Sequence, residues 1–228
     1  MIPSGSILGE GDLQVFALQA SLAVNERLSI VATKDGYNTL QADGIPNDQG
    51  FSDIAAGLKY VFVRDTCQQF FLSGGIIYEW SQGTSGVFQG NGDGVWHIFL
   101  TTGKEFGCNH FVGAFGWHLP NNISDESESI YYSLHLDREV ACGWYALWEL
   151  NGIHYVESGR ALPVSQEGGD WINLGATDVA GNHFLSTAVG ATKKVNRHLS
   201  LSAAFEFPIT GCEDLFNNRT YVQKSLTY

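Results

Sequence analysis

Three side chains with the chemistry of a hydrolase stand close together in this chain. Ser133, His135 and Asp137 occupy alternate positions of the stretch "SIYYSLHLDREV". A nucleophilic serine needs a histidine base within hydrogen-bond reach, and the histidine needs a carboxylate to orient it. Alternate residues of one strand point the same way, but this does not create a serine–histidine hydrogen bond. The pattern therefore predicts a protein that is not an enzyme and has no catalytic residues.

Cysteines and oxygen-rich loops are the candidates for metal chemistry. Cys67, Cys108 and Cys142 fall in short turns, Cys212 falls in a long loop, and no CxxC pair is present. One disulfide among the three turn cysteines remains an alternative. Free thiols are favoured, because neighbouring short turns lie about 10 Å apart, which is too far for a disulfide unless the turns move. The loop "FQGNGDG" (88–94) has closely spaced oxygens but lacks the EF-hand pattern. We expect no metal site and no cofactor.

Composition excludes some classes of protein. The 228 residues carry a net charge of −12, which argues against a nucleic-acid partner, because phosphate binding needs clustered Lys and Arg. No apolar run reaches the ~18 residues of a spanning helix. Only 16% of residues are charged and 13% are aromatic. So few charges would not coat an ordinary soluble surface.

The elements that position these residues are strands. About eleven stretches of mostly 10–14 residues, far longer than the ~5–6 of globular strands, alternate apolar and polar residues between turn signals. They are 13–24, 28–41, 52–64, 69–81, 95–106, 110–119, 129–140, 144–156, 183–195, 198–209 and 220–228. Residues 171–176, "WINLGA", are an alternative short extra strand. The fold class is all-β, and we expect one domain over 1–228.

The connections alternate between short and long. The long ones are 42–51, 82–94, 120–128, 157–182 and 210–219. In an up-and-down meander, all short turns then fall on one rim and all long loops on the other, as in outer-membrane barrels. We expect 157–182 to be an extracellular loop, which could fold inward as a constriction or lid.

The stretch "HLSLSAAFEF" (198–207) raises the question of which face is inside. Its alternate residues are apolar, and the others are small or charged. In the remaining strands too, small and charged residues share one face, which suits a water-filled lumen. We therefore predict that the apolar face meets lipid in an antiparallel transmembrane barrel, while a soluble β-sandwich is the alternative.

This assignment gives two sets of candidate site residues. The expected lumen and selectivity residues are Asp53, Lys59, Glu79, Glu105, His135, Asp137, Glu149, Lys194 and Glu206. The expected aromatic residues at the membrane interfaces are Tyr60, Trp80, Trp96, Trp117, Trp144 and Tyr228.

The strand count predicts a missing strand. Single-chain bacterial barrels have an even number of strands, and eleven is odd. We expect about twelve in the whole barrel, with one upstream strand and a signal peptide absent and residues 1–12 forming a loop or a truncated start. "MIPSGSILGEGD" lacks the basic and apolar regions of a signal peptide.

Several blocks resemble a known family. "GFSDIAAGLKYVFVRD", "FQGNGDG", "EGGDWINLGATDVAGN" and "HLSLSAAFEFPITGCEDLFNNR" are similar to blocks of bacterial outer-membrane barrels. These are the porin-like, transporter-like proteins of the meta-pathway of phenol degradation type, and the resemblance covers nearly all of 11–228. It implies passage of small, often hydrophobic compounds. The terminal "SLTY" resembles the aromatic signal that the barrel-assembly machinery reads.

Together these observations predict a porin-like channel of the bacterial outer membrane. Its partners would be the lipid bilayer, the barrel-assembly machinery and small solutes, which are hydrophobic or aromatic in the resembled family and cross by passive diffusion. The alternatives are a closed structural or surface-binding barrel, a membrane-embedded hydrolase and a soluble β protein.

Overall fold

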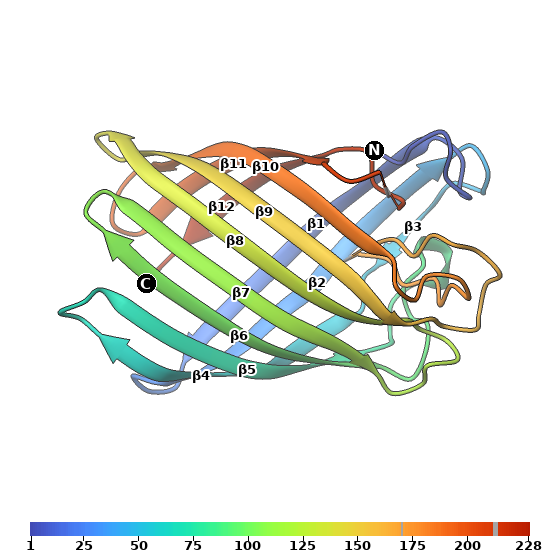
Figure 1. The fold of residues 1–228 in the computed structure, drawn as a ribbon, viewed down its shortest axis with the longest axis horizontal. Coiled ribbons are helices and arrows are strands. Elements are labelled where there is room, and N and C mark those ends of the chain that lie inside the picture. The colour runs from blue at the N-terminus through green and yellow to red at the C-terminus, as the bar shows by residue number, and fades with distance from the viewer. Residues whose placement is uncertain (170, 212–213) are drawn as a thin grey trace.

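Long antiparallel strands make up most of the molecule (Figure 1). The computed structural model describes residues 1–169, 171–211 and 214–228, so Cys212 lies outside the described residues. The strands are β1 (Gly11–Ala23), β2 (Leu28–Ala42), β3 (Asp48–Phe51), β4 (Ile54–Asp65), β5 (Phe70–Trp80), β6 (Val95–Phe106), β7 (Asn109–Pro120), β8 (Glu128–Ala141), β9 (Trp144–Glu157), β10 (His183–Lys194), β11 (Leu199–Pro208) and β12 (Arg219–Leu226). A 3-10 turn, η1 (Ser85–Val87), lies between β5 and β6.

The strands form one curled sheet in chain order. The path runs β1-β2-β4-β5-β6-β7-β8-β9-β10-β11-β12, and the short β3 pairs only with β2. The eleven predicted strands are therefore confirmed, while β3 lies inside the predicted loop 42–51. The alternative strand at 171–176 is wrong, because that segment makes one isolated bridge, between Leu162 and Ala176.

The alternation of connections divides the molecule into two rims (Figure 1). The turns at 24–27, 66–69, 107–108, 142–143 and 195–198 gather at one end, here called the short-turn rim, together with the C-terminus. The longer connections gather at the other end, here called the long-loop rim, where the N-terminus also lies. This separation agrees with the prediction for an up-and-down meander.

The two faces of the sheet have opposite chemistry. Large apolar side chains are exposed on the outer face: Phe16 is 80% exposed and Leu18 66%. Buried polar side chains, among them Ser73, Glu79 and Ser186, lie on the inner face. Such an inversion fits a sheet that meets lipid on its outside. Among the described residues no helix has the length and hydropathy of a membrane span.

The hydrophobic core sits at the long-loop rim. Its residues come from the N-terminal segment, from β2 and from three of the long connections: Ile2, Leu8, Leu40, Ala42, Val87, Ile172, Leu174 and Leu215. The loops thus bury their apolar side chains against one another and against strand ends, which holds them over the end of the curled sheet.

β1 and β12 are the two ends of the sheet path. No β1–β12 pairing occurs among the described residues. At the long-loop rim the chain start joins these edges: the Met1 ammonium donates to the Asn218 carbonyl at 2.8 Å, and the Asn217 amide donates to the Met1 carbonyl at 3.1 Å. The expected twelfth strand stays a prediction.

Candidate functional site: a charged inner face beneath a loop cap

Glu79 is the centre of one inner-face cluster. Its side chain is only 5% exposed and projects from β5 between Lys34 and His97. Lys34 on β2 places its Nζ 2.5 Å from Oε1, and His97 on β6 places its Nε2 2.9 Å from Oε2. The His97 ring meets His118 edge to face at 4.3 Å. Pairing of this kind is what makes a carboxylate tolerable at this depth.

Glu206 is the centre of a second cluster. It is 1% exposed on β11 and accepts from the guanidinium of Arg219 on β12, with Nη2 at 2.8 Å and Nε at 3.0 Å. Its other oxygen accepts from the Ser186 hydroxyl at 2.5 Å and from the Asn151 amide at 3.1 Å. Four adjacent strands, β9 to β12, are therefore linked through one carboxylate.

A third cluster joins His110, Asp137, His135 and Glu149 nearer the short-turn rim. His110 Nδ1 lies 2.6 Å from Asp137, whose other oxygen is 3.2 Å from His135 Nε2. His135 Nδ1 lies 2.6 Å from Glu149. Both nitrogens of His135 thus meet carboxylates, and neither faces the hydroxyl of Ser133 as a serine base would. The geometry favours a structural or lining role over catalysis.

The other predicted lumen residues do not belong to these three clusters. Lys59 is half-buried on the inner face of β4, and Glu105 is exposed near the end of β6. Lys194 lies over the Tyr145 ring at 4.2 Å. Asp53 is buried just before β4, where it accepts from the amides of Gly83 at 2.7 Å and Gly90 at 2.9 Å. Asp53 therefore anchors a loop at the long-loop rim, and does not line the middle of the lumen.

Three connections close over the long-loop end of this face. We call residues 81–94, 121–127, 158–169 and 171–182 the loop cap. Glu167 joins two of its segments, accepting from the Ser127 hydroxyl at 2.6 Å and the Gly175 amide at 2.7 Å. Gln89 adds a third, because its amide donates to the Trp171 carbonyl at 2.6 Å. These contacts place the loop 157–182 against the other cap segments; its role as a constriction or lid stays a prediction.

A second buried acid holds the loop cap to the strands. Asp214 accepts from the Glu167 amide at 2.6 Å and from the Tyr155 hydroxyl at 2.8 Å. Burial raises the pKa of Glu167, although the hydrogen bonds from Ser127 and the amides of Ala176 and Gly175 act against this.

Glu126 is the cap residue with the most unusual surroundings. It is 4% exposed, and its Oε2 has no hydrogen-bond partner among the described residues. Burial, reinforced by the nearby Glu79 carboxylate, raises the pKa of Glu126 to about 8. A cavity of about 40 Å³ separates this acid, Trp171 and Ile172 of the cap from Glu79, His97 and His118 below. The cap therefore fits closely against the first cluster.

The predicted interface aromatics lie at two levels of the outer face. Trp80, Trp96 and Trp117 are each about two-fifths exposed at the long-loop end of their strands. Tyr60 and Trp144 are similarly exposed towards the short-turn rim. Tyr228, fully exposed, lies beyond the end of β12.

Sequence reasoning found the acids but missed some of their partners. Lys34 escaped notice because a β-bulge between Ala32 and Asp35 shifts the alternation of β2. Glu126, Glu167 and Asp214 lie in or beside loops, where no alternation exists to be read. The three turn cysteines are free and exposed, and among the described residues no group of three or more His, Cys, Asp or Glu side chains is arranged so that it could hold a metal ion.

Comparison with known proteins identifies the fold. A NanC porin superposes with a TM-score of 0.59 over 92% of this chain and 91% of its own, at 8% identity. An outer membrane channel from Pseudomonas putida F1 superposes with a TM-score of 0.57 over 95% of this chain and 82% of its own, at 12% identity. No protein family and no curated protein sequence matches this chain. The predicted antiparallel, up-and-down β-barrel fold is therefore confirmed.

Proposed function

We propose that this protein is a channel of the bacterial outer membrane that passes small solutes by passive diffusion. The observation that carries the proposal is the reversed polarity of the sheet. Glu79 and Glu206 are buried and paired on the inner face, while residues such as Phe16 and Val222 are exposed on the outer face. A soluble barrel would bury the apolar set and expose the charges. Of the two similar structures, one is a porin and the other is an outer membrane channel.

The solute class is a finer part of the proposal. The inner face carries more acids than bases, which would favour cations over anions in an open lumen. Passage of hydrophobic or aromatic compounds is supported by the resemblance of the sequence blocks to the phenol-degradation type. Assembly through β12 and Tyr228 by the barrel-assembly machinery belongs to the same proposal.

The loop cap supports a second function. The cavity between the cap and the Glu79 cluster is only about 40 Å³, so the cap packs closely over these residues. A barrel that stays closed would have a structural or surface-binding role. A channel would instead need the cap to move.

Solute flux into liposomes separates the two functions. The folded protein, verified by a heat-modifiable gel shift, is compared with a variant in which 160–179 are replaced by a short Gly-Ser linker. A channel gated by the cap gives flux that falls with solute size and rises in the shortened variant. If neither protein passes ions, sugars or small aromatics, the channel proposal is contradicted and the closed barrel is supported.

A further inference from the structure

A groove on the outer face lies across β7, β8 and β9 near the short-turn rim. Leu136 of β8 pairs with Trp148 of β9, and Arg138 pairs with Ala146 two residues closer to that rim. Asn109 of β7 stands opposite Arg138. Because side chains alternate between faces, these five share the outer face. They line a hollow of about 390 Å³.

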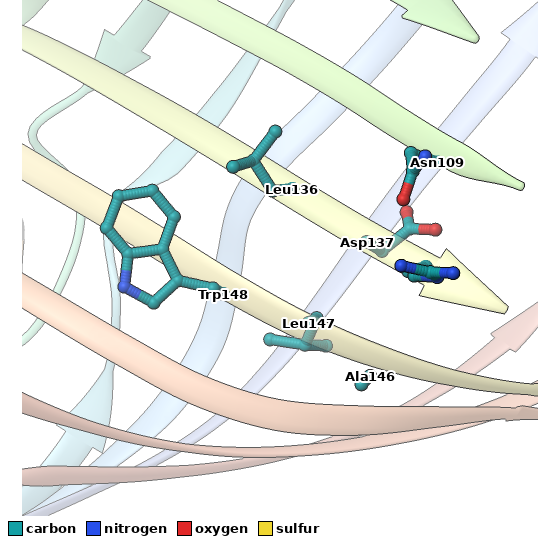
Figure 2. Close-up of a pocket in the computed structure, with 7 residues that line it drawn as sticks. Asn109, Leu136, Asp137, Ala146, Leu147 and Trp148 are labelled. Carbon is teal, nitrogen blue, oxygen red and sulfur yellow. The ribbon is translucent and has the colours of Figure 1, made fainter. Parts of the chain in front are cut away.

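The groove has an apolar body and a polar end. Figure 2 shows Leu136 and Trp148 on the near side of the strands, with Asp137 and Leu147 behind them. The hollow exists because Ala146 is small beside the large Trp148 on the same face. Its polar end is formed by Arg138 and Asn109 and is also lined by Asp137, whose carboxylate lies against His110 and His135 on the inner face. A ligand that fits must be apolar along most of its length and accept hydrogen bonds from Arg138 and Asn109.

Arg138 is available to bind such a ligand. Among the described residues no carboxylate lies within ion-pair distance of its guanidinium. A guanidinium matches the geometry of a phosphate group with two parallel hydrogen bonds. Trp148 adds an indole N–H to an apolar ring, a combination that suits the membrane interface.

Arg138 also belongs to a basic belt. On the outer face of β6 to β12, the positions near the short-turn rim include Lys104, Arg138, Lys193 and Lys224, and no acid. Two members already have aromatic partners: Lys104 lies 5.3 Å from the Phe106 ring centre, and Lys193 lies 5.0 Å from that of Trp144. On β6 to β12 this belt is of one sign, which is complementary to anionic headgroups, whereas Asp65 of β4 lies on the same face at this rim.

We propose that this groove binds an anionic phospholipid, with an acyl chain along Leu136, Ala146 and Trp148 and the phosphate on Arg138. The inference rests on the proposed membrane location. It goes beyond general contact with lipid because it assigns headgroup preference to one site. One cation close to an anionic headgroup contributes about 1 kcal/mol, which is about a fivefold preference over a zwitterionic lipid.

Quenching of Trp148 by brominated lipids tests the site. The protein is reconstituted with brominated phosphatidylglycerol or brominated phosphatidylcholine, and the signal of Trp148 is isolated by difference from W148F. We expect about fivefold preferential quenching by phosphatidylglycerol. R138Q should abolish this preference, whereas K224Q, which removes a belt charge outside the groove, should retain it. A146F should weaken quenching of Trp148 by both lipids, because it fills the groove.

The outcomes separate this site from the proposed function. If folded protein shows no quenching of Trp148 by either lipid, the membrane location fails and the lipid site fails with it. If both lipids quench equally, or if R138Q and K224Q lower the preference equally, only the lipid site is overturned. A heat-modifiable gel shift verifies that each variant is folded.

Discussion

Because Glu126 is buried in the closed loop cap, we expect the opening of the cap to depend on pH. The carboxyl is buried in the closed cap, faced by Glu79 from β5, Lys34 from β2, Asp53 before β4 and Asp125 of its own loop. Its pKa there is about 8. If the cap swings into water, the pKa returns to its ordinary value of 4.5. The open state then releases a proton that the closed state holds.

The size and sign of the effect follow from these two values. Below pH 4.5 the carboxyl is protonated in both states, so pH has no influence. Between 4.5 and about 8 the closed state binds more protons, and each pH unit favours opening by about 1.4 kcal/mol. Above about pH 8 the Glu126 carboxyl is ionised in both states, so a further rise in pH no longer shifts the balance between the closed and the open cap. The whole interval amounts to a ceiling of about 5 kcal/mol.

Conductance measured in planar bilayers between pH 5 and 8.5 checks this prediction. The wild-type open fraction should rise with pH and level off above about 8. E126Q cannot ionise, so its open fraction should rise less steeply. A residual slope is expected from Glu167, whose pKa burial also raises. D43N, which removes an exposed carboxylate of another long connection, is the matched control and should behave as wild type.

An identical pH slope in E126Q and wild type would refute the reasoning. A fall in conductance with rising pH would refute it as well, since ionisation of a buried acid cannot stabilise the state that buries it. A channel that never opens at any pH would instead contradict the proposed function.

Three further outcomes follow from the remaining contacts. R219Q leaves the buried Glu206 carboxylate uncompensated and should lower the free energy of unfolding by about 3–5 kcal/mol, measured by urea unfolding in detergent. The double variant E206Q/R219Q should recover part of this loss. If R219Q is as stable as the wild type, the pairing is contradicted. D214N weakens the hydrogen bonds from Tyr155 and the Glu167 amide, so the cap should be cleaved faster by protease, with D178N as the control. The exposed turn thiols of Cys67, Cys108 and Cys142 should react with a membrane-impermeant maleimide only from the short-turn side. Labelling on intact cells would contradict the expectation that the short-turn rim faces the periplasm.

The strands and their faces could be predicted because alternation constrains them residue by residue. The alternation puts Glu79 and Glu206 on the face opposite the large apolar residues, where both are buried, since a one-residue shift would turn every neighbour to the other side. Lys34 was missed because the bulge in β2 adds a residue and resets the pattern beyond it. Alternation is thus a reliable guide between bulges and a misleading one across them.

The cap could not be predicted for a different reason. Gln89 contacts Trp171, and Glu126 lies across a small cavity from Glu79; both pairs are far apart in the sequence and are brought together by the barrel rim. No local pattern encodes such pairs, because loops satisfy their polar groups with whichever partners the rim provides. The Gly-rich composition of 157–182 indicates a turn-rich segment, but it does not indicate which residues that segment contacts.

The chemistry of the cap suggests why closure would be reversible. A cap held only by apolar packing would resist opening at every pH, because the hydrophobic effect does not titrate. This cap buries Leu174 and Val87, but it also buries Glu126, one oxygen of which has no partner within the described part of the chain. A fully paired acid would stabilise the closed state, whereas Glu126 costs free energy once it ionises. The poorly satisfied carboxyl is therefore the point at which a change of pH can act on the closed state.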